Sequence, residues 1–255
     1  MRTDHREANG EARSAIDTDV GTGTERSSPR VVLVDSGVPA SLIDSLAGFT
    51  SVCDSDDALD RLGHGSALLA TLAWHRDLAT IDLGLVKLFD GRLATTTARL
   101  GLALETLLDA PPDWVLVSAG VARRDRRLGE VVAELRKAGT QLVASSARHG
   151  EPVYPAACEG VRAVTGDARR APGELARASD GRYLACAWAA RGAGSASGAR
   201  PWQAWDVGPP LRDQLATSWL GGASFAAAHA LGIWLAAGDD RGHETRGDKR
   251  LKVTG

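Results

Sequence analysis

The 255-residue sequence has few cysteines, no long apolar run and little net charge. Its three cysteines, Cys53, Cys158 and Cys186, lack the paired spacing of a disulfide framework or a zinc site. No apolar stretch is long enough to span a bilayer, and the polar N-terminal segment lacks the apolar core of a secretory signal. A formal net charge of −2 argues against a surface built for nucleic acid. We therefore expect a cytoplasmic protein that binds neither membrane nor nucleic acid.

The remaining composition is that of an ordinary globular protein, with 44% hydrophobic and 24% charged residues. Residues 1–29 are rich in charge, glycine, serine and threonine, and we expect them to be disordered. One folded domain is predicted over residues 30–237. The charged tail over residues 238–255 is expected to fray.

Short apolar runs alternate with helical patterns along the predicted domain. Strands are predicted at residues 30–35, 49–53, 81–89, 113–120, 141–145, 161–165 and 183–188. Helices are predicted at residues 39–47, 67–74, 95–108, 128–138 and 224–237. This alternation predicts an α/β fold, a three-layer doubly wound arrangement around a mainly parallel sheet.

A serine stands at the start of the last predicted helix. Two glycines precede Ser224 at a distance of two and three residues, and a run of small residues follows it. The free amides and the positive dipole at a helix start stabilise a developing oxyanion, so a nucleophile benefits there. The same pattern is also an ordinary helix cap, and alone it does not decide between the two interpretations.

An aspartate and a histidine stand in matching positions earlier in the chain. Asp35 ends the first predicted strand, where open α/β sheets collect their ligand-handling residues. His64 lies between Gly63 and Gly65 just before a helical run, and these glycines let another backbone approach closely. The chain order Asp, His, Ser is that of the subtilisin type of catalytic triad, and differs from the chymotrypsin and α/β-hydrolase orders.

These motifs resemble those of the subtilases, the subtilisin-like serine peptidases, over about residues 31–237. Val-Val-Leu-Val-Asp-Ser-Gly is similar to their Asp-[Ser/Thr]-Gly motif, and Gly-His-Gly-Ser is similar to His-Gly-Thr. Gly-Ala-Ser-Phe-Ala-Ala-Ala-His-Ala-Leu-Gly is similar to Gly-Thr-Ser-x-Ala-x-Pro-His-x-x-Gly. Val86-Lys87, Asp113–Gly120 and Tyr154-Pro-Ala-Ala are further matches.

The resemblance implies a subtilisin-like fold and a serine endopeptidase. Ser224 is then the nucleophile, His64 the general base and Asp35 the residue that orients the imidazole. A peptide or protein substrate would pair as an added strand along Ser118, Ala119 and Gly120, whose small side chains leave the backbone accessible. The segment 1–29 accommodates neither a signal nor a propeptide of the family, which favours intracellular processing of one peptide or precursor.

Three positions depart from the family pattern, and one of them is Ala228, which stands where the family has a proline before the helix histidine. Arg148 stands where the family has its oxyanion-hole asparagine, and Ala223 stands where it has the threonine before the nucleophile. Three interpretations stay open: a peptidase with Arg148 in the oxyanion hole, a scaffold that binds peptides without cutting them, and a partner subunit of another subtilase. A homo-oligomer is a further alternative for the assembly.

No cofactor is expected. Calcium is common in the family, but no acidic cluster marks a calcium site in this sequence. Of the other histidines, His229 is predicted to pack within its helix, while His75 and His149 are predicted to lie on the surface.

Overall fold

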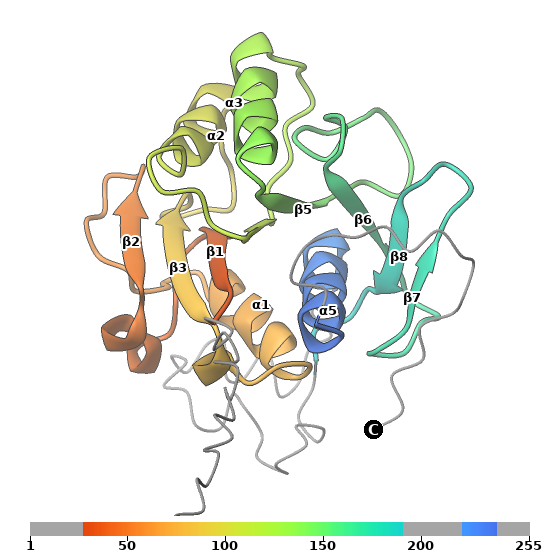
Figure 1. Cartoon of the computed structure of the whole chain (residues 1–255), viewed down its shortest axis with the longest axis horizontal. Helices are drawn as coiled ribbons and strands as arrows, with labels where there is room; N and C mark the ends of the chain where they lie inside the picture. The colour runs from red at the N-terminus through yellow and green to blue at the C-terminus, as the bar shows by residue number, and fades with distance from the viewer. Residues whose placement is uncertain (1–27, 191–220, 239–255) are drawn as a thin grey trace, which may run out of the picture.

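The computed structural model describes residues 28–190 and 221–238, so the predictions for the two terminal segments lie almost wholly outside the described residues. An eight-stranded sheet with the order β2-β3-β1-β4-β5-β6-β8-β7 crosses the middle of the molecule (Figure 1). All pairs are parallel except β7 with β8. The strands are β1 (Arg30–Asp35), β2 (Gly48–Ser51), β3 (Asp82–Lys87), β4 (Trp114–Val117), β5 (Gln141–Ser145), β6 (Arg162–Asp167), β7 (Leu175–Arg177) and β8 (Tyr183–Cys186).

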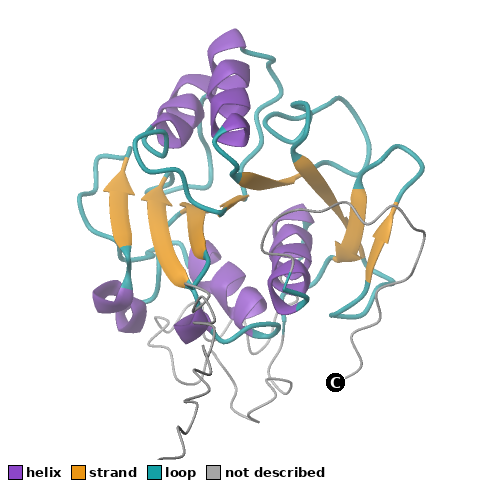
Figure 2. Ribbon diagram, viewed as in Figure 1, coloured by secondary structure: helices purple, strands orange, loops and turns teal. Residues whose placement is uncertain are grey.

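Helices cover both faces of the sheet and make three layers (Figure 2). The helices α2 (Thr97–Glu105) and α3 (Arg126–Lys137) lie on one face, and α1 (His64–Ala73) and α5 (Ala223–Ala236) lie on the other. Two short 3-10 helices, η1 (Ala40–Ser45) and η2 (Leu78–Thr80), complete the described elements.

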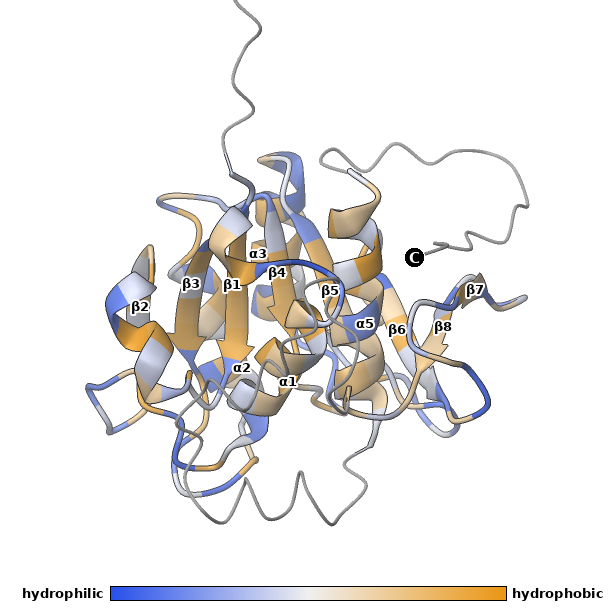
Figure 3. Ribbon diagram, turned by 90° about the horizontal axis from the view of Figure 1, so that it is seen from below, coloured by the Kyte–Doolittle hydropathy of each residue, from blue (hydrophilic) through white to orange (hydrophobic). Residues whose placement is uncertain are grey.

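The strands are apolar on both faces because each face is covered. In β1, Val31 and Leu33 belong to the core under α1 and α5, whereas Val32 and Val34 belong to the core under α2 and α3. This is the near-continuous burial that a parallel sheet requires. Seen from below, the central strands are accordingly hydrophobic along most of their length (Figure 3).

The helix α5 is embedded among other elements. It contacts β5, β6, β8 and α1, and every residue from Phe225 to Leu235 is buried. A helix buried on all sides must be apolar or small all round, which explains its run of alanines. The start of α5 is therefore held firmly at the carboxyl edge of the sheet.

The α/β class, the three layers and the mainly parallel sheet are confirmed. Two details differ. The segment predicted as a helix at 39–47 is the shorter 3-10 helix η1, whose apolar side chains Leu42 and Ile43 are only partly buried against the core. The three-residue strand β7 was not predicted, because it is too short to show a periodic pattern.

No helix in the described ranges has both the length and the apolar character needed to cross a membrane. The division into domains at residues 29 and 237 stays a prediction.

Candidate active site

Asp35 and His64 form a hydrogen-bonded pair at the carboxyl edge of the sheet. The Nδ1 of His64 lies 2.9 Å from Asp35 Oδ2 and 3.0 Å from Oδ1. The Asp35 side chain is fully buried and the His64 side chain is 17% exposed. Since Nδ1 faces the carboxylate, it carries the proton and donates it, which leaves Nε2 as the basic nitrogen.

Close packing of α1 against the end of β1 brings the pair together. The helix begins at His64, three residues before the start predicted at residue 67, so His64 lies in its first turn. A Cβ on Gly65 would collide with the carbonyl oxygen of Gly37 and lie 3.2 Å from Asp35 Oδ1. The glycine beside His64 therefore allows the close backbone approach that the sequence suggested.

The carboxylate of Asp60 holds the N-terminal end of α1. It accepts hydrogen bonds from the amides of Leu62 at 3.0 Å, Gly63 at 2.7 Å and Ser66 at 2.7 Å. An anionic side chain that takes up free amides stabilises a helix start. Asp60 thus fixes the backbone from which His64 projects.

Burial and charge act in opposite directions on the pair. Burial alone raises the pKa of Asp35, but the charge of His64 and hydrogen bonds from His64, Ser118 and the Ser36 amide outweigh it and lower that pKa. Burial alone lowers the pKa of His64, but the charge and hydrogen bond of Asp35, with a contribution from Asp60, raise it above the ordinary value. The pair favours an ionised carboxylate and stabilises an imidazolium.

Two serines support the Asp35 carboxylate. The Ser36 amide donates to Oδ1 at 2.7 Å, and the Ser36 hydroxyl lies 2.9 Å both from this oxygen and from Asp60 Oδ1. The Ser118 hydroxyl donates to Asp35 Oδ2. These contacts leave the buried carboxylate fully hydrogen-bonded, as a charge removed from water requires.

Ser224 lies in the first turn of α5, as predicted. Its hydroxyl donates to the carbonyl oxygen of Ser118 at 3.3 Å. The ring of the next residue, Phe225, meets the His64 ring edge-on with centroids 5.6 Å apart. Within the described residues no hydrogen bond joins Ser224 to His64, so Ser224 connects to the pair through Ser118.

The backbone before Ser224 has a geometry that only glycine adopts readily. Gly222 has a φ of 146°, and its amide donates to the carbonyl oxygen of Ala187 at 2.8 Å. Gly221 forms a β-bridge with Trp188, just after β8, and the turn at Gly222 then leads the chain into α5. The amides of the first helical turn have no partner within the helix and are available to a ligand.

The predicted substrate strand runs beside the site. Ser118 and Ala119 are nearly buried and Gly120 is exposed. In the described ranges, the backbones of Ala119 and Gly120 make no hydrogen bond to other backbone groups. Such a segment can pair with an extended peptide, although its role in binding stays a prediction.

Arg148 follows β5 and points toward the end of β6. Its guanidinium donates to the carbonyl oxygen of Gly166 at 3.2 Å and lies 3.7 Å from the Asp167 carboxylate. The side chain is 46% exposed and lines a pocket of about 390 Å³. No hydrogen bond in the described ranges links it to Ser224, and its predicted place in an oxyanion hole stays a prediction.

The other histidines fall into two groups. His229 is fully buried, with Nε2 2.8 Å from the Trp188 carbonyl oxygen, and its predicted packing role is confirmed. The surface prediction for His75 was wrong, because its Nε2 lies 2.7 Å from His229 Nδ1 and its ring packs against Gly232. His149 is exposed. These contacts join residues 154 positions apart, which a local sequence pattern cannot reveal.

The role of Asp60 as a supporting residue is not apparent from the sequence. Its only local signal is its place three residues before Gly63, which is the cap position of α1. In the described residues no group of three or more histidine, cysteine, aspartate or glutamate side chains could hold a metal ion. The three cysteines are free thiols.

No protein-family model and no curated protein match this sequence. Solved structures do resemble it. A mutant protease domain of PatA is 18% identical, with a TM-score of 0.54 and coverage of 82% of this chain and 78% of that one. The nisin leader peptidase NisP from Lactococcus lactis is 14% identical, with a TM-score of 0.53 and coverage of 82% and 77%. The prenylagaramide maturation protease PagA is 18% identical, with a TM-score of 0.52 and coverage of 82% and 74%.

These findings correct one expectation. The motifs suggested membership of the subtilase family, but no family model matches the sequence, and the structural similarities are distant in sequence and modest in TM-score. The likeness to the three proteins is one of fold. The chain has a subtilisin-like peptidase fold.

Proposed function

We propose that this protein is a serine endopeptidase in which Asp35, His64 and Ser224 act together. The observation that carries the proposal is the buried Asp35–His64 pair, joined at 2.9 Å and placed beside the start of α5. A carboxylate that fixes the tautomer of a histidine prepares its other nitrogen to accept a proton. The fold shared with three proteases agrees with this chemistry.

In the proposed reaction, Ser224 Oγ leaves the Ser118 carbonyl and attacks the scissile carbonyl carbon. His64 Nε2 takes the hydroxyl proton and later gives it to the leaving amine, while Asp35 stabilises the imidazolium. The acyl-enzyme is then hydrolysed by water along the reverse proton path. Hydrogen bonds between catalytic groups are commonly long without substrate, so the absent Ser224–His64 bond does not oppose this role.

The oxyanion would be held by the Ser224 amide and by Arg148. The amide lies in the first turn of α5, where the helix dipole favours negative charge. The Arg148 guanidinium donates a hydrogen bond to the Gly166 carbonyl oxygen. Gly166 lies close to the start of α5, because a Cβ added to it would be 3.4 Å from the Gly222 carbonyl oxygen. We propose that Arg148 turns from the Gly166 carbonyl toward the start of α5 when substrate binds.

The substrate would be a peptide or precursor protein, extended along Ser118, Ala119 and Gly120. Two of the similar structures are a leader peptidase and a maturation protease, which favours processing of a specific precursor as the biological task. We propose that this processing takes place in the cytoplasm.

The alternative is a protein that binds peptides without cutting them, alone or as the partner subunit of a peptidase. It is favoured by one observation: the Ser224 hydroxyl and the Arg148 guanidinium each donate a hydrogen bond to a backbone carbonyl oxygen, and these two oxygens belong to different residues, Ser118 and Gly166.

Labelling with a fluorophosphonate separates the two functions. We expect the wild-type protein to react once, at Ser224, and both Ser224→Ala and His64→Gln to stay unlabelled. Ser146→Ala is the matched control, since this serine is buried near the end of β5 and its hydroxyl lies 3.5 Å from the Ala147 carbonyl oxygen. A folded wild-type protein that does not react would refute the peptidase and leave the peptide-binding function.

A further inference from the structure

Lys87 is a buried cation that touches none of the proposed reacting groups. It ends β3, its backbone pairs in register with Asp35 of β1, and its side chain is 1% exposed. Removing an ammonium from water costs several kcal/mol unless its protons are all bonded. The hydrogen-bond partners of the Lys87 ammonium therefore indicate which part of the structure it holds in place.

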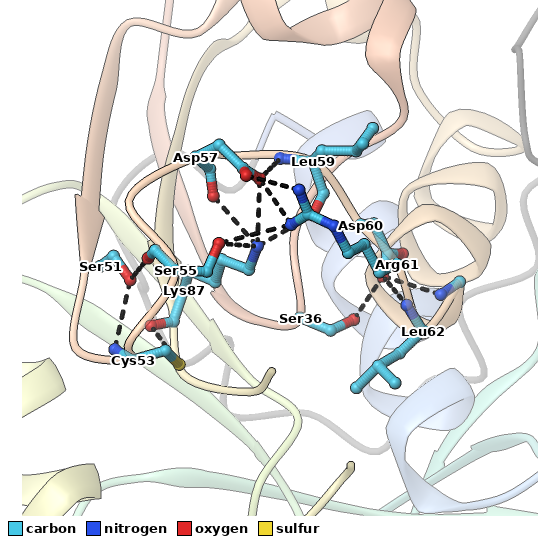
Figure 4. Close-up of polar contacts among 11 residues, drawn as sticks. Ser36, Ser51, Cys53, Ser55, Asp57, Leu59, Asp60, Arg61, Leu62 and Lys87 are labelled. Carbon is cyan, nitrogen blue, oxygen red and sulfur yellow. Dashed lines mark hydrogen bonds and ion pairs between the residues drawn. The ribbon is translucent and has the colours of Figure 1, made fainter. Parts of the chain in front are cut away.

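All of these partners lie on the loop between β2 and α1 (Figure 4). The Nζ lies 3.1 Å from Ser55 Oγ, 3.0 Å from the Asp57 carbonyl oxygen and 2.9 Å from the Leu59 carbonyl oxygen. The Asp57 carboxylate lies at 3.4 Å. An ammonium has three N–H groups, so these oxygens satisfy it completely and draw the loop around it.

The outer side of the loop is closed by Arg61. Its guanidinium binds both carboxylate oxygens of Asp57, at 2.9 and 2.6 Å. The hydrogen bonds from Arg61 lower the pKa of Asp57 against the effect of burial, and the charge of Lys87 lowers it further. Asp57 is thus shared between a buried cation and an exposed one, and stays ionised.

This loop leads directly into the support of His64. Val38 exchanges backbone hydrogen bonds with it, accepting from the Asp60 amide and donating to the Ala58 carbonyl, both at 2.9 Å. Asp60 then holds the first amides of α1. A displacement of the residues around Lys87 would therefore move Asp60 and the helix start that carries His64.

We propose that Lys87 is a positioning residue, whose ammonium fixes residues 55–59 so that Asp60 holds the start of α1 and keeps His64 against Asp35. The proposal rests on the proposed peptidase function for its effect on the reaction. A misplacement of about 1 Å at a reacting group can slow a reaction about 100-fold, so a residue outside the site can control its rate.

A purely stabilising role would have a different signature. Arg76 offers the comparison, because its guanidinium donates to the Leu235 carbonyl oxygen at 2.6 Å and joins the segment after α1 to the last turn of α5. Its replacement removes this hydrogen bond and the one that its Nε donates to Thr80 Oγ1 at 2.8 Å, both of them away from the loop around Lys87. Arg76→Met and Lys87→Met should both lower stability, but only the second should disturb His64.

The test measures saturation kinetics of fluorophosphonate labelling together with amide hydrogen exchange, at a temperature where each variant is folded by circular dichroism. For Lys87→Met we expect the maximal labelling rate to fall about tenfold to 100-fold, with the half-saturating probe concentration nearly unchanged. The amides of Gly63 and Ser66 should exchange faster, while those of Leu33 and Leu85 in the sheet should not. Arg76→Met should keep the wild-type maximal rate.

A folded Lys87→Met protein with the wild-type rate, or with unchanged exchange at Gly63 and Ser66, would overturn the proposal. So would an equal loss of rate in Arg76→Met. If Lys87→Met does not fold, the double variant Ser55→Ala, Asp57→Ala removes both side-chain partners of Lys87 and should cause the same changes in labelling rate and exchange, but smaller ones. If the wild type does not label at all, the peptidase function fails, and the exchange measurement alone decides whether Lys87 positions the helix start.

Discussion

Replacing Asp35 with asparagine tests the central pair without changing its shape. The carboxylate is fully buried and lies 2.9 Å from His64 Nδ1. Two unit charges about 4 Å apart attract each other by about 4 kcal/mol at an effective dielectric constant near 20. Loss of this attraction leaves only the smaller contribution of Asp60 against the effect of burial, so we expect the pKa of His64 to fall below its ordinary value.

The asparagine also changes the tautomer. Its amide can turn an NH₂ group toward Nδ1, which places the histidine proton on Nε2 and removes the base that Ser224 needs. We expect the rate of fluorophosphonate labelling to fall about 10⁴-fold, which corresponds to about 5.4 kcal/mol in the barrier.

The assay combines labelling kinetics with an NMR titration of the histidine ring protons, where His64→Gln assigns the resonance. Asp125→Asn is the control, because this carboxylate caps α3 by accepting a hydrogen bond from the Leu128 amide and touches none of the proposed reacting groups. An unchanged pKa of His64 in Asp35→Asn, or a labelling rate within tenfold of the wild type, would refute the reasoning.

Three further predictions concern other parts of the site. Arg148→Ala should slow labelling about 100-fold through loss of an oxyanion donor, while Arg177→Ala, whose guanidinium donates to the Gly181 carbonyl oxygen, should change it little; equal rates for the two would remove Arg148 from the reaction. Gly65→Ala should destabilise the fold by about 1–3 kcal/mol in chemical denaturation, because its Cβ meets the Gly37 carbonyl, whereas Gly101→Ala in α2 meets open space and should be neutral or stabilising. Burial lowers the pKa of His75 to about 3, helped by the charge of His229, and lowers that of His229 to about 4. The unfolded chain therefore binds protons first as the pH falls below about 6.5, so stability should decline from there down to about pH 3, and His229→Gln should flatten this decline in thermal melts at each pH.

The sequence predicted the parts of the site that are encoded in neighbouring residues. Asp35 at the end of an apolar run, His64 between glycines and Ser224 after a glycine pair each show their local structure in a few positions. The observed strand end and the two helix starts agree with these patterns. The long parallel strands were predicted for the same reason, since burial on both faces demands continuous apolar runs.

The remaining parts depend on strand register and on the packing of separate elements. The contact of Ser118 with Asp35 requires β4 to lie beside β1, and the loop around Lys87 requires β3 on the other side. Each of these residues looks ordinary among its neighbours in the chain. The rotamer of Arg148 likewise depends on the Gly166 carbonyl, which the sequence does not place.

The position of Ser224 at the start of the last described helix has a consequence for synthesis. Asp35 and His64 come from the first strand and the first helix, but the proposed nucleophile reaches them only after β6 and β8 have formed the surface on which α5 rests. A chain still emerging from the ribosome would carry an acid–base pair with nothing to activate. In the proposed peptidase, the order of elements therefore places the nucleophile last, so the three groups come together only once the whole sheet has been synthesised.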